Sequence, residues 1–105
     1  MGPIKVNSIA ELRKMTGNPE VSLDGIVEEV DKGKGHLSIK DENLDVRPLN
    51  CLSIGGALLG KEITKGNKVN VTGDYYPNDN SYNERLLLKG IIIYQTSIND
   101  SELPQ

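Results

Sequence analysis

The stretch of residues 63–76 constrains the fold more than any other part of this chain. After a turn that contains glycine, Val69 and Val71 alternate with polar residues, which is the period of a strand with one buried face. Gly73 interrupts that strand, and a glycine inside a strand marks a bend or the close approach of another backbone. A second apolar run, residues 84–94, follows after a short polar loop. Together the two runs predict the last hairpin of a small β-barrel.

The same alternation predicts three earlier strands, at residues 20–30, 36–40 and 44–52. Gly25 is expected to bend the first strand, because a long strand must bend sharply where a five-stranded barrel closes. In the second strand, Leu37 and Ile39 are predicted to point inward, and the residues between them outward. Pro48 weakens the third strand and favours an edge or a strand end there.

Two short helical segments complete the predicted elements. Ser8 and Glu11 have the spacing of a capping box, and the apolar residues that follow share one helical face, so a helix is expected over residues 8–15. Residues 53–63 mix good helix formers with three glycines, which favours a helical turn over a long helix. The polar residues 96–105 lack periodicity and are predicted to form a disordered tail.

Length and composition bound the class of protein. A chain of 105 residues is expected to form one domain, here residues 1–95, with an aliphatic core because it has no Trp and no Phe. Its single cysteine, Cys51, excludes an intrachain disulfide and is predicted to be a buried, inert thiol. The first residues lack a signal-peptide pattern, and no apolar run is long enough for a membrane span. We therefore expect a soluble cytoplasmic protein that does not act at a membrane.

The formal net charge of −3 argues against tight non-specific binding to duplex DNA, which depends on neutralising phosphates. A locally basic groove stays compatible with that charge. Residues 55–62 resemble a phosphate-binding P-loop, but Glu62 stands where the motif needs a hydroxyl group. Nucleotide binding through that loop is therefore not expected.

The segments 21–27, 37–41 and 65–73 resemble the OB-fold nucleic-acid-binding superfamily, of the type found in replication protein A and archaeal single-strand-binding proteins. The resemblance covers residues 4–94. It implies an all-β, five-stranded OB-type Greek-key barrel with one or two short helices. It also implies a non-enzymatic module that binds single-stranded DNA or RNA.

OB-folds bind on the face of their second and third strands, between two flanking loops. That face and its loops supply the predicted nucleic-acid-binding residues: Lys32, Lys34, His36, Lys40, Arg47, Tyr76, Tyr82 and Arg85. The cations suit phosphates and the tyrosine rings suit bases. Members of the superfamily usually carry aromatic residues on these two strands, and this chain has none there. We therefore expect weak binding with little sequence preference.

A protein-interaction subunit or adaptor is the alternative function. The last predicted strand is apolar on both faces, and its second face needs cover from the chain's own helix or from a protein partner. The predicted partner interface comprises Leu87, Ile91 and Ile93.

Catalysis is not expected, and neither is a cofactor or a metal site. One histidine and one cysteine cannot supply a catalytic triad or an evident zinc site. Glu28 and Glu29 are the most prominent carboxylate pair. Adjacent residues of a regular strand point to opposite faces, so these two are predicted to lie apart.

Overall fold

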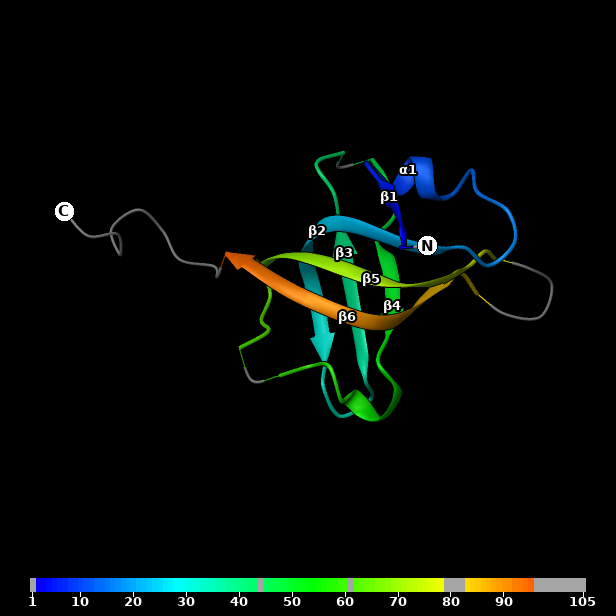
Figure 1. Cartoon of the computed structure of the whole chain (residues 1–105). Coiled ribbons are helices and arrows are strands. Elements are labelled where there is room, and N and C mark those ends of the chain that lie inside the picture. Colours follow the sequence, from blue (N-terminus) through cyan, green and yellow to red (C-terminus); the bar gives the residue numbers. More distant parts are fainter. Residues whose placement is uncertain (1, 44, 61, 79–82, 96–105) are drawn as a thin grey trace.

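The computed structural model describes residues 2–43, 45–60, 62–78 and 83–95 (Figure 1). Within those residues the elements, in chain order, are β1 (Ile4–Val6), α1 (Ile9–Leu12), β2 (Glu20–Asp31), β3 (His36–Lys40), β4 (Leu49–Leu52), the 3₁₀ turn η1 (Ile54–Gly56), β5 (Lys68–Tyr76) and β6 (Arg85–Gln95). The predicted tail at 96–105 and Tyr82 lie outside the described residues.

Five of the strands form a closed ring. Hydrogen-bonded neighbours run β2, β3, β4, β6 and β5, and β5 pairs again with the first half of β2. The pair β4–β6 is parallel, and the other pairs in the ring are antiparallel. This arrangement confirms the predicted five-stranded OB-type barrel. The short strand β1 was not predicted; it pairs in parallel with β2 outside the ring.

The seams of the ring differ in length. β2 and β5 are paired from Glu20 to Ile26, whereas the described part of β4 meets β6 at two positions, Cys51 with Leu86 and Leu52 with Leu87. The ring therefore closes on one short parallel seam.

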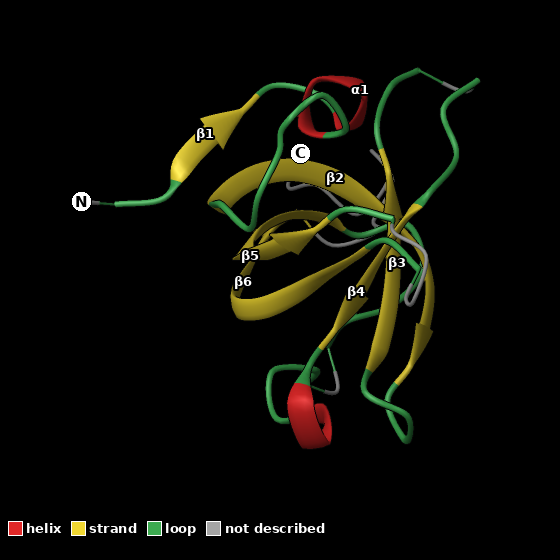
Figure 2. Ribbon diagram, turned by 90° about the vertical axis from the view of Figure 1, so that its right-hand side faces the viewer, coloured by secondary structure: helices red, strands yellow, loops and turns green. Residues whose placement is uncertain are grey.

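The core is aliphatic, as predicted, and it continues under the N-terminal helix. Leu37 and Ile39 point inward from β3, and Ile9 and Leu12 of α1 join the same cluster with no exposed surface. Figures 1 and 2 show α1 at one end of the barrel and η1 at the other. The helix thus closes one end of the barrel, whereas η1 lies at the other end with none of its residues buried.

The helix is shorter than the predicted 8–15. Ser8 caps it, since its Oγ accepts a hydrogen bond of 3.0 Å from the amide of Glu11, as the sequence predicted. After Leu12 the hydrogen bonds tighten: the amide of Met15 donates to the carbonyl of Leu12. Such i→i+3 bonds are typical where a short helix ends.

Three β-bulges interrupt the alternation of side chains along the strands. β2 gains one extra residue at Glu28 against β3, and β6 gains one at Lys89 and one at Tyr94 against β5. β2 changes its pairing partner from β5 to β3 at Ile26, directly after Gly25, and the bulge at Lys89 directly precedes Gly90. Gly73 allows β5 and β6 to approach each other closely. A Cβ at this position would lie 2.1 Å from the carbonyl oxygen of Leu87, so only glycine fits there.

The third predicted strand is largely wrong. β4 begins at Leu49, directly after Pro48, so the stretch before it is a loop rather than a strand. A turn stabilises that loop: the amide of Val46 donates to the carbonyl of Asn43, and the amide of Asp45 donates to the Asn43 side chain. The proline has no amide hydrogen for the ladder, and pairing starts beyond it.

Candidate functional site

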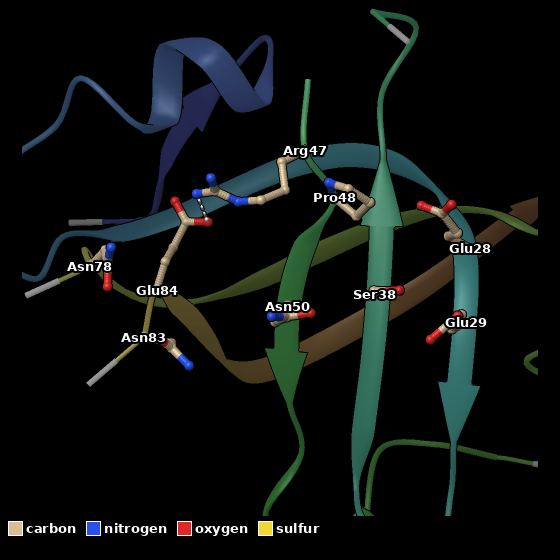
Figure 3. A pocket seen from close by; sticks show the side chains of 9 residues that line it. All are labelled: Glu28, Glu29, Ser38, Arg47, Pro48, Asn50, Asn78, Asn83 and Glu84. Carbon is tan, nitrogen blue, oxygen red and sulfur yellow. Dashed lines mark ion pairs between the residues drawn. The ribbon is translucent and has the colours of Figure 1, made fainter. Parts of the chain in front are cut away.

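A cleft of about 520 Å³ lies over the outer faces of β3 and β4 and beside the connection between β5 and β6 (Figure 3). β2, β3 and β4 contribute Glu28, Glu29, Ser38 and Asn50, with Arg47 and Pro48 just before β4. The β5–β6 connection contributes Asn78, Asn83 and Glu84. The cleft occupies the face on which the sequence analysis placed the binding site. Its lining is mainly polar, and none of the described residues that form it is aromatic.

Glu84 holds one wall of the cleft in place. Its carboxylate accepts two hydrogen bonds of 2.8 Å from Arg13 and one of 2.6 Å from the hydroxyl of Tyr75. Arg13 also donates to the carbonyl of Pro48 at 3.1 Å. The network therefore ties the end of α1 to both sides of the cleft.

The protonation state of this network follows from its contacts. Burial acts to raise the pKa of Glu84, but the hydrogen bonds from Arg13 and Tyr75 outweigh it, and the pKa is lowered. The hydrogen bond to Glu84 raises the pKa of Arg13. Burial, and then the same carboxylate, raise the pKa of Tyr75. Glu84 is thus ionised at neutral pH, beside a charged arginine and a neutral tyrosine.

Arg47 is the predicted site residue that lines this cleft. Its side chain is 70% exposed, and its guanidinium lies 3.9 Å from Glu84 (dashed line in Figure 3). It stands on the loop before β4 rather than on a strand, which corrects the sequence prediction.

Glu28 and Glu29 both line the cleft, so the prediction that they point to opposite faces is wrong. The reason is the bulge in β2: Val27 pairs with Ile39 and Glu29 with Ser38, so Glu28 is left without a partner on β3. A bulge re-aims side chains in this way, and bulges are common beside functional sites.

Two other predicted cations, Lys34 and Lys40, lie beside different clefts. A neighbouring cleft shares Glu28 and Glu29 with the first and adds Lys34, His36 and Lys65. Lys40 lies at the far end of β3, in a third cleft near α1 that also contains Lys68. The structure therefore does not bring the predicted cations together in one groove.

The loop between β2 and β3 carries Lys32 and Lys34, and its backbone is already engaged. The amide of Lys34 donates to Asp31, and the amide of Gly35 donates to the carbonyl of Lys32. Gly35 has φ +67°, and a Cβ there would lie 2.2 Å from the carbonyl oxygen of Ser53. Gly35 therefore permits close packing against η1, and these amides are not free to bind a phosphate.

Tyr76, one of the two predicted aromatic contacts, lies outside the cleft. Tyr76 is half-buried, and the guanidinium of Arg85 lies 4.5 Å from its ring centroid, a cation–π contact between β5 and β6. Neither residue lines the cleft. One face of the Tyr76 ring is therefore already covered.

The bulge at Lys89 changes the predicted partner face. Ile91 and Ile93 pack against the core, whereas Leu87 is half-buried. Ile92 and Tyr94 are the exposed apolar residues of β6, at 60% and 54%. The partner interface predicted from the sequence therefore stays a prediction. The apolar side chains of β6 that are exposed belong to the neighbouring residues Ile92 and Tyr94.

The described part of the chain bears on three further features: a metal site, a reactive thiol and a membrane-spanning helix. No group of three or more His, Cys, Asp or Glu side chains there could hold a metal ion. Cys51 is buried, and burial raises the pKa of its thiol. No helix among the described residues is long and apolar enough to cross a membrane.

Sequence reasoning missed the residues that shape the cleft. Arg13 and Glu84 are 71 positions apart and nothing local pairs them. The polar run before the last strand, which contains Asn78 and Asn83, was a usable signal, because OB-folds use that connection for binding.

Comparison with solved structures identifies the fold. The chain is similar to a protein of the S. pombe Stn1–Ten1 complex (14% identity, TM-score 0.65, 90% of this chain and 78% of that one). It is also similar to the hypothetical protein ygiW from E. coli (16% identity, TM-score 0.61, 89% and 90%). The mitochondrial single-stranded DNA-binding protein Rim1 of S. cerevisiae matches as well (16% identity, TM-score 0.60, 79% and 100%).

No family model matches the sequence, and a comparison with curated proteins gives no match. At these identities the structural likeness shows the fold alone. This chain is an OB-fold protein.

Proposed function

We propose that this OB-fold protein is a non-enzymatic module that binds single-stranded nucleic acid, weakly, in the cleft over β3 and β4. The observation that carries the proposal is the position of the cleft, on the barrel face and beside the loop with which OB-folds bind oligonucleotides. Its amide, hydroxyl and guanidinium groups suit hydrogen bonding to splayed bases and to a phosphate. Rim1, which has a similar fold, is a single-stranded DNA-binding protein, and this supports the same class of ligand here.

Weak binding follows from the lining. The outward side chains of β3 and β4 that reach the cleft, Ser38 and Asn50, offer no ring for stacking. Each missing base–aromatic stack forfeits about 1–3 kcal/mol. The carboxylates of Glu28 and Glu29 repel phosphates, so affinity must come mainly from base edges.

Binding without catalysis fits the protonation states. A general acid at neutral pH needs a raised carboxyl pKa, whereas that of Glu84 is lowered. His36 Nε2 lies 3.2 Å from Asn50 Oδ1, and no serine or cysteine is among the described residues that line the cleft of His36.

Fluorescence anisotropy with labelled single-stranded DNA and RNA tests the proposal. Saturable binding that Arg47→Gln weakens is expected, while Lys14→Gln, on the exposed turn after α1, serves as the matched control. Because Arg47 is the one cation among the described cleft residues, the salt dependence should be shallow, with a slope of about −0.7 per phosphate contacted. Absence of saturable binding at low salt and high protein concentration would contradict the proposal.

A protein-interaction module is the second candidate, and the exposure of Ile92 and Tyr94 favours it. The two side chains lie close together near the end of β6, and both are largely exposed. Light scattering after size-exclusion chromatography tests self-association: a dimer that Ile92→Ser converts to a monomer supports this function. A monomer at all concentrations contradicts the homo-oligomeric form of this candidate.

A further inference from the structure

The cleft has two ends of opposite charge. At one end, Glu84 receives two guanidinium hydrogen bonds from Arg13, so its charge is matched behind the cleft wall. Arg47 stands 3.9 Å away, 70% exposed, with a positive charge that is left over. At the other end, Glu28 and Glu29 make no ion pair within the described part of the chain. Figure 3 shows Asn50 and Ser38 between the two ends.

The acidic end lacks a hydrogen-bond donor. The Oε2 atom of Glu28 is buried and has no hydrogen-bond partner. An ionised carboxylate only accepts hydrogen bonds, and leaving a buried acceptor unpaired costs free energy. The bulge in β2 holds this side chain and that of Glu29 on the cleft. No cation in the described part of the chain forms an ion pair with either glutamate, so a ligand that brings hydrogen-bond donors to this end meets carboxylates whose charge is unopposed.

We infer that the cleft discriminates among bases, favouring those whose Watson–Crick edge carries adjacent donors, guanine above all. This inference rests on the proposed function. The N1–H and N2–H₂ groups of guanine lie side by side and match the two oxygens of one carboxylate. The exocyclic amines of cytosine and adenine offer a single such donor group, as in the pairing of Glu with cytosine N4. Thymine and uracil present acceptors on both sides of their one ring N–H, and these face the carboxylates unfavourably.

The end of the cleft beside Glu84 positions the nucleic-acid strand. Arg47 takes a phosphate oxygen through its guanidinium, which suits bidentate contact with phosphate. Asn50 lies between the two ends and can donate and accept. This inference replaces the expectation of little sequence preference with a preference for donor-bearing bases.

Three labelled strands of about twelve nucleotides, a length within the range that one OB-fold contacts, test this inference by anisotropy. The first contains thymine alone, the second has guanine at every third position, and the third has inosine at the same places. Inosine differs from guanosine only by lacking the N2 amine. We expect the guanine strand to bind about fivefold more tightly than the thymine strand, with inosine between them.

Two variants separate a donor preference from simple charge repulsion. Glu28→Gln and Glu29→Gln should remove the guanine preference, whereas Glu42→Gln, an exposed acid outside this cleft, should retain it. Circular dichroism verifies that each variant is folded. Equal affinity for all three strands, or a preference that survives both substitutions, overturns the inference and leaves the proposed function standing. Absence of binding to every strand overturns the proposed function itself.

Discussion

Replacing Glu84 by glutamine should destabilise the barrel markedly at neutral pH. The substitution keeps the size of the side chain but removes the charge that accepts two hydrogen bonds from Arg13 and one from Tyr75. Breaking a buried ion pair by removing one partner costs about 3–5 kcal/mol. The Arg13 side chain is 20% exposed and can recover some hydration, so we expect a loss of about 2–3 kcal/mol.

Urea unfolding followed by circular dichroism measures that loss. For a domain of this size it corresponds to a fall in Tm of about 10 °C. Glu20→Gln is the matched control, because Glu20 pairs with Lys89 on the exposed surface and such pairs contribute little. The control should unfold at the wild-type midpoint within error.

The pH dependence of the same measurement tests the cause. The pKa of Glu84 is lowered in the folded protein, so its stabilising effect is fully present above the ordinary glutamic pKa of about 4.3. That effect is lost as pH falls through the folded-state pKa. The difference between wild type and Glu84→Gln should therefore be largest near neutral pH and shrink below about pH 4.3. An equal difference at pH 7 and pH 3, or none at pH 7, would refute the reasoning.

Three further predictions concern other parts of the barrel. Gly73→Ala should cost more than about 3 kcal/mol, or prevent folding, because its Cβ would meet the carbonyl of Leu87; thermal unfolding measures this. Ser8→Ala should cost about 1 kcal/mol, since the amide of Glu11 loses its cap, and the same scan detects it. Cys51 should react with a thiol reagent only after unfolding, because it is buried and its pKa is raised; fast labelling of the native protein would contradict its burial.

The strands whose side chains alternate could be predicted from sequence. The strand over 68–76 was found at its observed bounds because Val69 and Val71 face the core and the residues between them do not. The helix cap at Ser8 was equally local. The strand before residue 49 failed because one proline decides where pairing can begin, and its effect depends on the neighbouring strand.

The cleft could be placed but its character could not. The position of the cleft follows from the barrel fold. Its charge depends on the bulge at Glu28, and no glycine in the sequence marks that bulge. The other determinant is a contact between Arg13 and Glu84, which only the closed ring brings together. The bulge and the Arg13–Glu84 contact both depend on how distant strands pair when the barrel closes. The alternation of apolar and polar residues along one strand does not contain that information.

The short parallel seam between β4 and β6 has a consequence for how the molecule opens. With paired residues at Cys51–Leu86 and Leu52–Leu87, its ladder is much shorter than the ladder between β2 and β5, which runs from Glu20 to Ile26 along β2. We expect it to part first in native-state fluctuations, with amide hydrogens there exchanging faster than those between β2 and β5. Arg47 and Glu84 lie just beyond the two strands of this seam, so each opening event also widens the cleft. We expect the rate at which a long single strand of nucleic acid enters the cleft to depend on how often this seam opens.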